Sequence, residues 1–211
     1  MSSNHYPMAV WNGGDLINNG FIGGNDFGIS VSGDATIGGQ LINNGTITGS
    51  ITEPGPSATA IFVQNDAGFN VINNGLLEGD VVLGIGNDIF TGNDGVVTGT
   101  IFGNRGDDTI IAGSNGASIE GGQGNDISFG GAGNDVFIFR ENSGADSIGG
   151  FIDGQDQLDV SALFDDAEEA IAAASQTALG TVIDLGGDTT NTVTLFGINV
   201  EQLDATDFLF A

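Results

Sequence analysis

The amino-acid sequence predicts an all-β fold: a parallel β-solenoid in which a β-helix runs into a β-roll, followed by a small β-rich C-terminal module containing one helix. The chain has 211 residues, of which 38 are glycine. The glycines lack the three-residue period of collagen, and a hydrophobic content of 39% is too high for a disordered chain. Two families of short repeats run along the sequence, and such units bury their apolar faces by stacking on one another.

The charge of the chain is strongly negative, with 28 Asp and Glu residues against two arginines, Arg105 and Arg140, and a formal net charge of -26. Nucleic acids and anionic membranes bind basic patches, so this composition excludes both as partners. Cations relieve the mutual repulsion of the carboxylates, and divalent cations are therefore the expected partners. The absence of cysteine excludes disulfides and thiolate metal sites.

Residues 1–15 are expected to form an extended N-terminal segment. The segment has no basic stretch followed by an apolar one, so we expect no Sec-type signal peptide. We also expect no membrane span, because no apolar run approaches the roughly 20 residues of a spanning helix. The stretch NHYPMAVWN, residues 4–12, is apolar enough to be donated as a strand to a neighbouring copy, and folding back onto the first rung is the alternative.

The first repeat family has the pattern Asn-Asn/Asp-Gly-x-apolar-x-Gly and begins at Asn18, Asn43, Asn73 and Asn93. The unequal but similar intervals between these starting positions fit the rungs of a parallel β-helix with loops of variable length, which we assign to residues 16–82. The Asn-Gly pairs are expected to supply the positive-φ residues of tight turns, and a meander of hairpins is the alternative fold. The last three copies continue to a second apolar residue, namely Ile51, Val81 and Ile101.

The second repeat family has the nine-residue pattern Gly-Gly-x-Gly-x-Asp-x-apolar-x. Copies begin at Gly103, Gly121 and Gly130, and LGIGNDIFT from Leu83 is a near match. The glycine-rich turn exposes backbone carbonyls and its Asp projects a carboxylate, and Ca²⁺ prefers hard oxygen ligands of both kinds. Turn formation alone would explain one isolated copy, but three copies in close register favour calcium. The apolar residues expected to point inward after the Asp are Phe90, Ile110 and Phe137.

These repeats, GNRGDDTII, GGQGNDISF and GGAGNDVFI, resemble the RTX, or haemolysin-type, calcium-binding repeats. The resemblance implies a β-roll over residues 83–138, in which two repeats make one turn and several Ca²⁺ ions lie between stacked turns. Equivalent carboxylates then recur once per turn, as Asp108 and Asp126 do, whereas the position one turn before Asp135 is Ala117. The expected carboxylate ligands are Asp88, Asp108, Asp126, Asp135, Asp146 and Asp156. The expected backbone ligands belong to Gly103, Arg105, Gly121 and Gln123. Asp153 and Asp159 either add ligands or belong to a solvated acidic loop.

The glycine repeats fade after residue 138, and residues 139–211 are expected to form a C-terminal module. Its predicted helix is Asp165–Thr177, and strands are predicted at Thr181–Leu185 and Asn191–Phe196. The stretch GADSIGGFIDGQDQLDVSAL and the ending VTLFGINVEQLDATDFLFA resemble the C-terminal module of type I secreted RTX proteins. The resemblance implies a capping role, an uncleaved export signal, a type I exporter as partner, and a location outside, or on the surface of, a Gram-negative bacterium.

The sequence shows no catalytic constellation, so we expect that the protein is not an enzyme. His5 is the only histidine, which excludes a HExxH zinc site and leaves a Ser-His-Asp triad without support. Arg105 is expected to be a surface ion-pair partner. We predict a secreted calcium-binding structural protein that folds on calcium outside the cell and self-assembles head to tail into filaments or a surface or biofilm matrix.

Three alternative functions stay open. A calcium-dependent adhesin, or a module that binds extracellular polysaccharide, could stack sugars on Tyr6 or Trp11. An ice-binding face could be built from the Thr-x-Thr segments at Thr46 and Thr98. A polysaccharide-modifying enzyme is less favoured, because the chain offers few basic residues beside its carboxylates.

Overall fold

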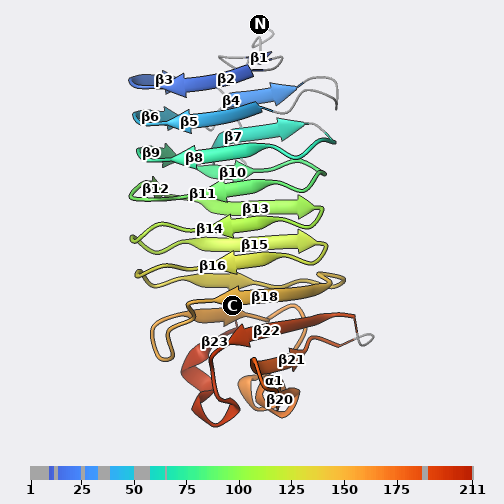
Figure 1. Cartoon of the computed structure of the whole chain (residues 1–211). Coiled ribbons are helices and arrows are strands. Elements are labelled where there is room, and N and C mark those ends of the chain that lie inside the picture. Colours follow the sequence, from blue (N-terminus) through green and yellow to red (C-terminus); the bar gives the residue numbers. More distant parts are fainter. Residues whose placement is uncertain are drawn as a thin grey trace, which may run out of the picture.

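The computed structural model describes residues 10–11, 14–24, 27–32, 39–49, 58–64, 66–186 and 190–210. The chain winds rung by rung along an elongated column, from its N-terminal end to a C-terminal module at the other end (Figure 1). Neighbouring strands of the column pair in parallel. The predicted parallel β-solenoid is therefore confirmed, and the alternative of a hairpin meander is excluded.

Two long sheets and one short sheet form the walls of the column in the described part of the chain. Sheet A contains β1 (Val10–Trp11), β4 (Phe27–Ser32), β7 (Thr59–Gln64), β10 (Asp80–Val82), β13 (Thr100–Arg105), β15 (Ser118–Gln123), β17 (Val136–Ile138), β19 (Gln157–Asp159) and β23 (Phe208–Leu209). Sheet B contains β2 (Gly14–Asn18), β5 (Gly39–Asn43), β8 (Asn70–Asn73), β11 (Ile89–Thr91), β14 (Thr109–Ile111), β16 (Ile127–Phe129), β18 (Ala145–Gly149), β22 (Thr192–Phe196), β21 (Gly180–Asp184) and β20 (Ala174–Gln176). Sheet C contains β3 (Phe21–Gly23), β6 (Thr46–Thr48), β9 (Leu76–Glu78) and β12 (Val96–Val97).

The number of strands per turn falls from three to two along the column. Each rung from β2 to β13 uses one strand of each sheet, because the Asn-rich repeats supply the strands of sheet C. From β14 to β19 a turn uses one strand of sheet B and one of sheet A. Two nine-residue repeats make one such turn, since Ile101 pairs with Ile119 and Thr109 pairs with Ile127. The three-strand rungs thus continue past residue 82, the boundary expected from the sequence.

The core is a stack of inward-facing apolar side chains, because alternate residues of a strand point to opposite faces. On sheet A successive turns contribute, in register, Ile29, Ile61, Val81, Ile101, Ile119, Phe137, Leu158 and Phe208. Phe90 and Ile110 are fully buried on sheet B. The predicted inward positions are confirmed, except that Ile51 lies outside the described residues. Burying each such side chain contributes about 1.5–3 kcal/mol, which only the neighbouring turns make possible.

A ladder of buried asparagines, which sequence reasoning missed, runs along the N-terminal rungs. The Nδ2 atom of Asn18 donates to Oδ1 of Asn43 at 2.8 Å, and Nδ2 of Asn43 donates to Oδ1 of Asn73 at 2.8 Å. Asn43 and Asn73 have no exposed surface, so the ladder supplies partners for amides that water cannot reach. A second, exposed ladder joins Asn19, Asn44, Asn74 and Asn93.

The expectation that the Asn-Gly pairs supply positive-φ residues is wrong for three of the four copies. Among the described turns of this repeat, only Asn93 has a positive φ, of 42°. In the other copies the first Asn side chain holds the turn by accepting the glycine N–H, as Asn43 does from Gly45 at 3.2 Å. Glycine is needed there because the rungs stack closely, and a Cβ on Gly45 would overlap the carbonyl oxygen of Gly20.

The fourth copy departs from the others because it holds one extra residue. Thr91 pairs with Ile72 and Val96 pairs with Leu76, so this copy has one more residue between the two paired positions than the preceding copy has. The inserted residue shifts Asn93 onto the exposed ladder, and its backbone adopts the left-handed conformation that asparagine tolerates.

The N-terminal segment is described only at Val10 and Trp11 and from Gly14 onward. Val10 and Trp11 pair in parallel with Ser30 and Val31 of the same chain, which is the arrangement expected if the segment folds back onto its own first rung. The residues before Val10, including His5 and Tyr6, lie outside the described part of the chain.

The C-terminal module closes the parallel stack with an antiparallel unit. Helix α1 (Ala167–Ala172) is capped at its N-terminus by Asp166, whose Oδ1 accepts the Glu169 N–H at 3.0 Å. The helix is shorter than predicted, because the end of the expected segment forms β20 and pairs with β21 instead. The predicted strands correspond to β21 and β22, which pair antiparallel, and two short 3₁₀ helices follow at Val200–Gln202 and Ala205–Asp207. In the described residues no helix has the length and apolarity to cross a membrane.

Candidate calcium-binding site

Aspartates of successive turns form a ladder of hydrogen bonds on one edge of the roll. The Oδ1 atom of Asp108 accepts the N–H of Asp88 at 2.7 Å, Asp126 accepts from Asp108 at 2.8 Å, and Asp146 accepts from Asp126 at 2.9 Å. Each carboxylate is thereby fixed against the turn before it, in the stacked order that the repeat spacing predicts.

A shorter ladder lies on the other edge. There Oδ1 of Asp135 accepts the Ala117 N–H at 2.8 Å, and Oδ1 of Asp156 accepts the Asp135 N–H at 3.0 Å. Ala117 therefore takes the place predicted for it, opposite Asp135 and without a carboxylate of its own.

Three of these aspartates have a second oxygen without a partner. The Oδ2 atoms of Asp108, Asp126 and Asp135 are buried and accept no hydrogen bond in the structure. The three residues are only 1%, 2% and 1% exposed, so bulk water does not solvate these oxygens. A buried carboxylate oxygen left this way is costly, and it indicates a site that a further group completes.

The glycine at the first position of each repeat keeps space beside the unpartnered oxygen. A Cβ on Gly103 would overlap Oδ2 of Asp108, and a Cβ on Gly121 would overlap Oδ2 of Asp126. Gly130 stands in the same relation to Asp135, although sequence reasoning did not place it among the site residues. Its position at the start of the third complete repeat was the signal that could have identified it.

Two other predicted carboxylates, Asp88 and Asp156, are satisfied by donors of the protein. Asp88 accepts the Phe69 N–H at 2.6 Å with Oδ1 and the Gly84 N–H at 2.9 Å with Oδ2. In Asp156 the Oδ2 atom accepts the Ile152 N–H at 2.8 Å. The structure therefore places Asp88 and Asp156 on the two ladders but leaves neither with a free oxygen.

The backbone ligands expected at Arg105 and Gln123 lie side by side, because the two residues pair in register between β13 and β15. The carbonyl of Gln123 accepts the Gly106 N–H at 2.9 Å, and a carbonyl oxygen retains a second lone pair for a cation. The Arg105 side chain is exposed and forms no ion pair within the described residues, contrary to the expectation from sequence.

The ion pairs of the roll belong to the other arginine. Arg140 lies 3.6 Å from Glu120 and 3.7 Å from Asp159. Asp159 also accepts the Ser161 hydroxyl at 2.6 Å, while Asp153 is exposed in the loop after β18. Neither of these two aspartates joins the ladders, and the structure thus separates them from the candidate site.

Burial raises the pKa of five aspartates of the ladders above the usual value of an aspartate. Desolvation raises the pKa of Asp126 and of Asp135 to about 6, and that of Asp88 also to about 6. Desolvation, with repulsion from neighbouring aspartates, raises the pKa of Asp108 and of Asp146 to about 8. The ladder is therefore a place where either a cation or protons must compensate the buried charge.

The donor set fits calcium. In the described residues no group of three or more acidic, His or Cys side chains is arranged to hold a metal ion, so no site there rests on side chains alone. Calcium takes six to eight oxygens and accepts backbone carbonyls beside carboxylates. A turn that offers one unpartnered carboxylate oxygen and glycine backbone matches this preference, whereas it lacks the nitrogen and sulfur ligands typical of zinc. Asp108, Asp126 and Asp135 would hold the ions, with backbone oxygens of the adjoining glycine turns.

Comparison with known proteins identifies the family. The family model described as peptidase M10 serralysin C terminal matches residues 62–211. The chain belongs to the serralysin C-terminal family. This family is the non-catalytic, RTX-type calcium-binding part of serralysin-like proteins, and the resemblance to RTX repeats is thereby confirmed.

Two solved structures resemble this serralysin C-terminal chain, and the first of them shares its fold. The extracellular lipase LipA from Serratia marcescens aligns over 96% of this chain with 16% identity and a TM-score of 0.51, and the chain spans 38% of that lipase. The AlgE6R3 subunit of the mannuronan C5-epimerase from Azotobacter vinelandii aligns over 65% of this chain and 78% of its own length, with 25% identity and a TM-score of 0.36. No curated protein sequence matches the chain.

Proposed function

We propose that this chain is a secreted structural protein that folds on calcium outside the cell and self-assembles into filaments or a surface or biofilm matrix. The observation that carries the proposal is the set of three buried, unpartnered Oδ2 atoms on stacked turns. If calcium exceeds the dissociation constant about tenfold, each site adds about 1.4 kcal/mol. Three sites add about 4 kcal/mol, which approaches the lower end of the net stability of about 5–15 kcal/mol of folded proteins.

Export from the cell is consistent with folding that depends on calcium. Inside the cell calcium is scarce, and the repulsion within a chain of net charge -26 opposes folding. We propose that a type I exporter of a Gram-negative cell recognises the C-terminal module and releases the chain where millimolar calcium completes the ladders. The membership of residues 62–211 in the serralysin C-terminal family supports this route.

The experiment compares the wild-type protein with Asp126→Asn in chelator and during a calcium titration. Circular dichroism is expected to show a calcium midpoint several-fold higher for the variant, because the substitution removes a charged ligand. Asp94→Asn, on an exposed turn, is the matched control and should leave the midpoint unchanged. Negative-stain electron microscopy of the same samples tests assembly, and ordered filaments are expected only with calcium. An unchanged midpoint for Asp126→Asn would remove that residue from the site.

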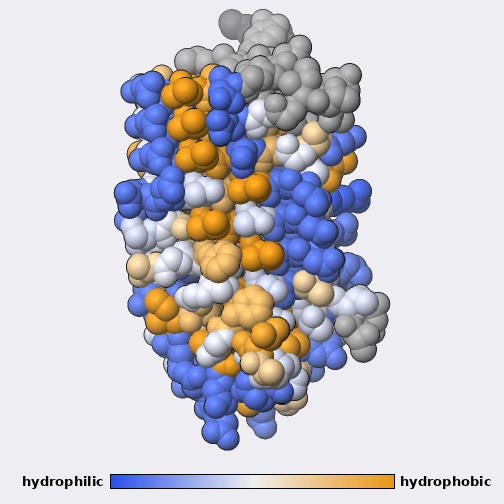
Figure 2. All heavy atoms as spheres, in the orientation of Figure 1, coloured by the Kyte–Doolittle hydropathy of each residue, from blue (hydrophilic) through white to orange (hydrophobic). Residues whose placement is uncertain are grey.

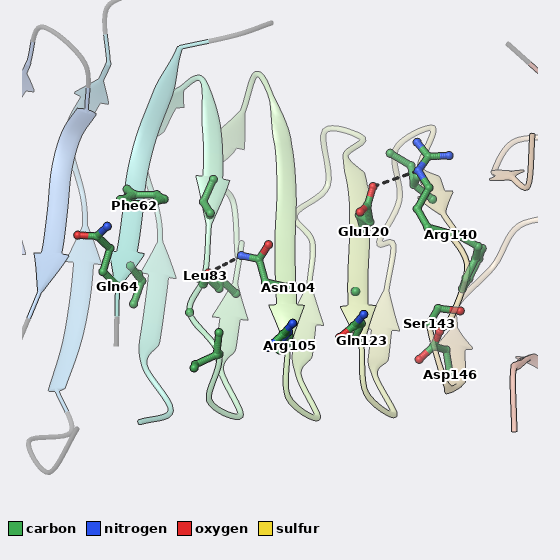
Figure 3. A pocket seen from close by; sticks show the side chains of 18 of the residues that line it. Phe62, Gln64, Leu83, Asn104, Arg105, Glu120, Gln123, Arg140, Ser143 and Asp146 are labelled. Carbon is green, nitrogen blue, oxygen red and sulfur yellow. Dashed lines mark hydrogen bonds and ion pairs between the residues drawn. The ribbon is translucent and has the colours of Figure 1, made fainter. Parts of the chain in front are cut away.

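A groove on the outer face of sheet A favours a second candidate function, the binding of extracellular polysaccharide. The groove has a volume of about 610 Å³ and crosses the ends of β7, β10, β13 and β15 (Figure 3). Both arginines of the chain line it. The side chains of Arg105 and Gln123 lie next to each other there, and neither has a hydrogen-bond partner within the described residues. Free planar donors bind sugar hydroxyls, and Phe62, which lines the same groove two strands away on β7, offers an apolar face to a sugar ring.

Glycan binding is tested with the calcium-loaded protein and two probes, a neutral soluble glucan and an anionic polyuronate. The acidic chain should repel the polyuronate, so binding is expected for the glucan alone. Arg105→Ala and Gln123→Ala are each expected to weaken that binding about tenfold, which corresponds to about 1.4 kcal/mol. Gln40→Ala, an amide on sheet B, is the control. Equal affinities for all variants would assign the groove no role in glycan binding.

A further inference from the structure

The outer face of sheet B carries a continuous row of apolar side chains. Its outward positions pair in register from β2 to β16 in the order Ile17, Ile42, Ile72, Thr91, Ile111 and Phe129. A parallel row on the same strands adds Ile89 and Ile127. We call the seven Ile and Phe residues of the two rows the apolar stripe. Figure 2 shows this stripe as a hydrophobic column that runs down the face of the molecule.

The stripe is open to solvent. Ile17 is 52% exposed, Ile127 is 42% exposed and Phe129 is 41% exposed. Single exposed apolar residues are ordinary on protein surfaces, but a contiguous column over six strands is a feature of interaction surfaces. The alternate positions of these strands, such as Leu41 and Phe90, fill the core, so the stripe is not needed for the packing of the column itself.

The charge distribution identifies the partner. Beyond Asp15 at the N-terminal end, the two outward rows contain no charged residue, although the chain has a net charge of -26. Exposed carboxylates lie elsewhere on the column, as Glu78 does on sheet C and as Asp94 and Asp107 do on turns between strands. Two copies can therefore pair through the stripe without bringing their carboxylates close together. Contact through the acidic parts of the surface would place like charges against each other.

We propose that the apolar stripe is the surface through which two copies of this chain pair side by side. The stripe offers on the order of 500 Å² per molecule, and a pair would bury on the order of 1,000 Å², which lies at the lower limit of specific interfaces. The pairing is thus weak and depends on concentration. Because the same face meets itself, the contact is isologous and closes as a dimer, so the proposed filaments would need a further contact that extends them. The inference rests on the proposed self-assembly and names its lateral contact.

The C-terminal end of the column offers less for association. At the C-terminal end sheet A finishes with the two-residue strand β23, and sheet B finishes with the antiparallel strand β20. Short edges and a reversed strand limit the addition of further parallel rungs. Lateral pairing through the stripe is therefore better supported by the described residues than the head-to-tail contact expected from the sequence.

The test is sedimentation velocity of the full, calcium-loaded chain over a range of concentrations at low and high salt. The wild type is expected to form dimers, and their fraction should rise with salt because screening weakens the repulsion between copies. The double variant Ile111→Thr, Ile127→Thr should raise the dissociation constant at least about tenfold. Threonine suits strands and already occupies the neighbouring outward positions Thr91 and Thr109.

Ile152→Thr combined with Leu179→Thr is the matched control, because these residues are 40% and 68% exposed but lie outside the stripe. Loss of dimers in the stripe variant but not in the control supports the inference. Equal dimerisation of the two variants overturns it while self-assembly stands. A wild type that remains monomeric at every concentration and salt overturns self-assembly as well. If circular dichroism shows that the double variant is unfolded, the single variant Ile17→Thr at the end of the stripe gives the same readout.

Discussion

In calcium-free buffer, the protein is expected to become more stable as the pH falls from 8 to 5. Burial raises the pKa of Asp126 and Asp135 to about 6 and that of Asp108 to about 8, above the value of 3.8 for a solvated aspartate. A carboxyl group with a raised folded-state pKa stabilises the fold below its unfolded pKa and loses this contribution as the pH rises through the folded pKa. The loss therefore runs from about pH 4, the unfolded pKa, to about pH 8, with only Asp108 of the three still contributing above about pH 6, and protons replace calcium at the ladders.

Thermal melts followed by circular dichroism measure this effect. In calcium-free buffer, Tm should rise by on the order of 10 °C between pH 8 and pH 5. Excess calcium should remove or reverse the trend, since protons and calcium compete for the same oxygens. The triple variant Asp108→Asn, Asp126→Asn, Asp135→Asn lacks these three groups and should show a flatter profile, with the remaining slope due to Asp88 and Asp146. A calcium-free Tm that is constant or falls from pH 8 to pH 5 would contradict the burial of ionisable, uncompensated carboxyl groups.

Asn43→Leu is expected to destabilise the N-terminal rungs by about 2–4 kcal/mol. The substitution removes the middle of the buried ladder, because Asn43 accepts from Asn18 and donates to Asn73, each at 2.8 Å. Two buried amides then lose a partner, and the apolar gain of leucine does not offset both losses. Leucine also removes the Oδ1 atom that holds the turn through the Gly45 N–H.

Asn44→Leu provides the matched control for this ladder. Asn44 is the next residue and also belongs to a ladder of amides, but it is exposed and water can replace its partners. We expect a change within about 0.5 kcal/mol for the control. Urea unfolding in saturating calcium, with hydrogen exchange to locate the affected rungs, distinguishes the two variants. Similar losses of stability for Asn43→Leu and Asn44→Leu would show that burial of the first ladder does not add to the stability of the rungs.

The repeat spacing predicted most of the fold, because a solenoid places equivalent residues at equal intervals. It predicted the inward Phe90 and Phe137. The resemblance to RTX repeats implied that two repeats make one turn of the roll, which places Ala117 opposite Asp135. Local rules failed where stacking between rungs decides the conformation. The Asn-Gly pairs look like positive-φ turns in isolation, but glycine there prevents a clash with the neighbouring rung.

The sequence predicted which aspartates lie on the ladders, but not which of them keep an oxygen without a hydrogen-bond partner. The sequence shows the same Asn-Asp pair at Asp88 as at Asp126, yet backbone N–H groups of Phe69 and Gly84 occupy both oxygens of Asp88. Only the Leu83 that replaces the first glycine of this copy hinted at a different environment. The apolar stripe was invisible for a related reason, because a strand pattern does not reveal which outward residues align across rungs until the register is known.

Equilibrium dialysis against radioactive calcium tests the central claim most directly, by counting the ions bound at about 1 mM free calcium. The comparison is between the triple variant Asp108→Asn, Asp126→Asn, Asp135→Asn and a control of equal charge, Asp94→Asn, Glu168→Gln, Glu201→Gln, whose substituted residues are all exposed. The control should bind as many ions as the wild type, and the triple variant should lose the ions held by the three unpartnered oxygens. Equal binding by the two variants would contradict the assignment of these oxygens to calcium.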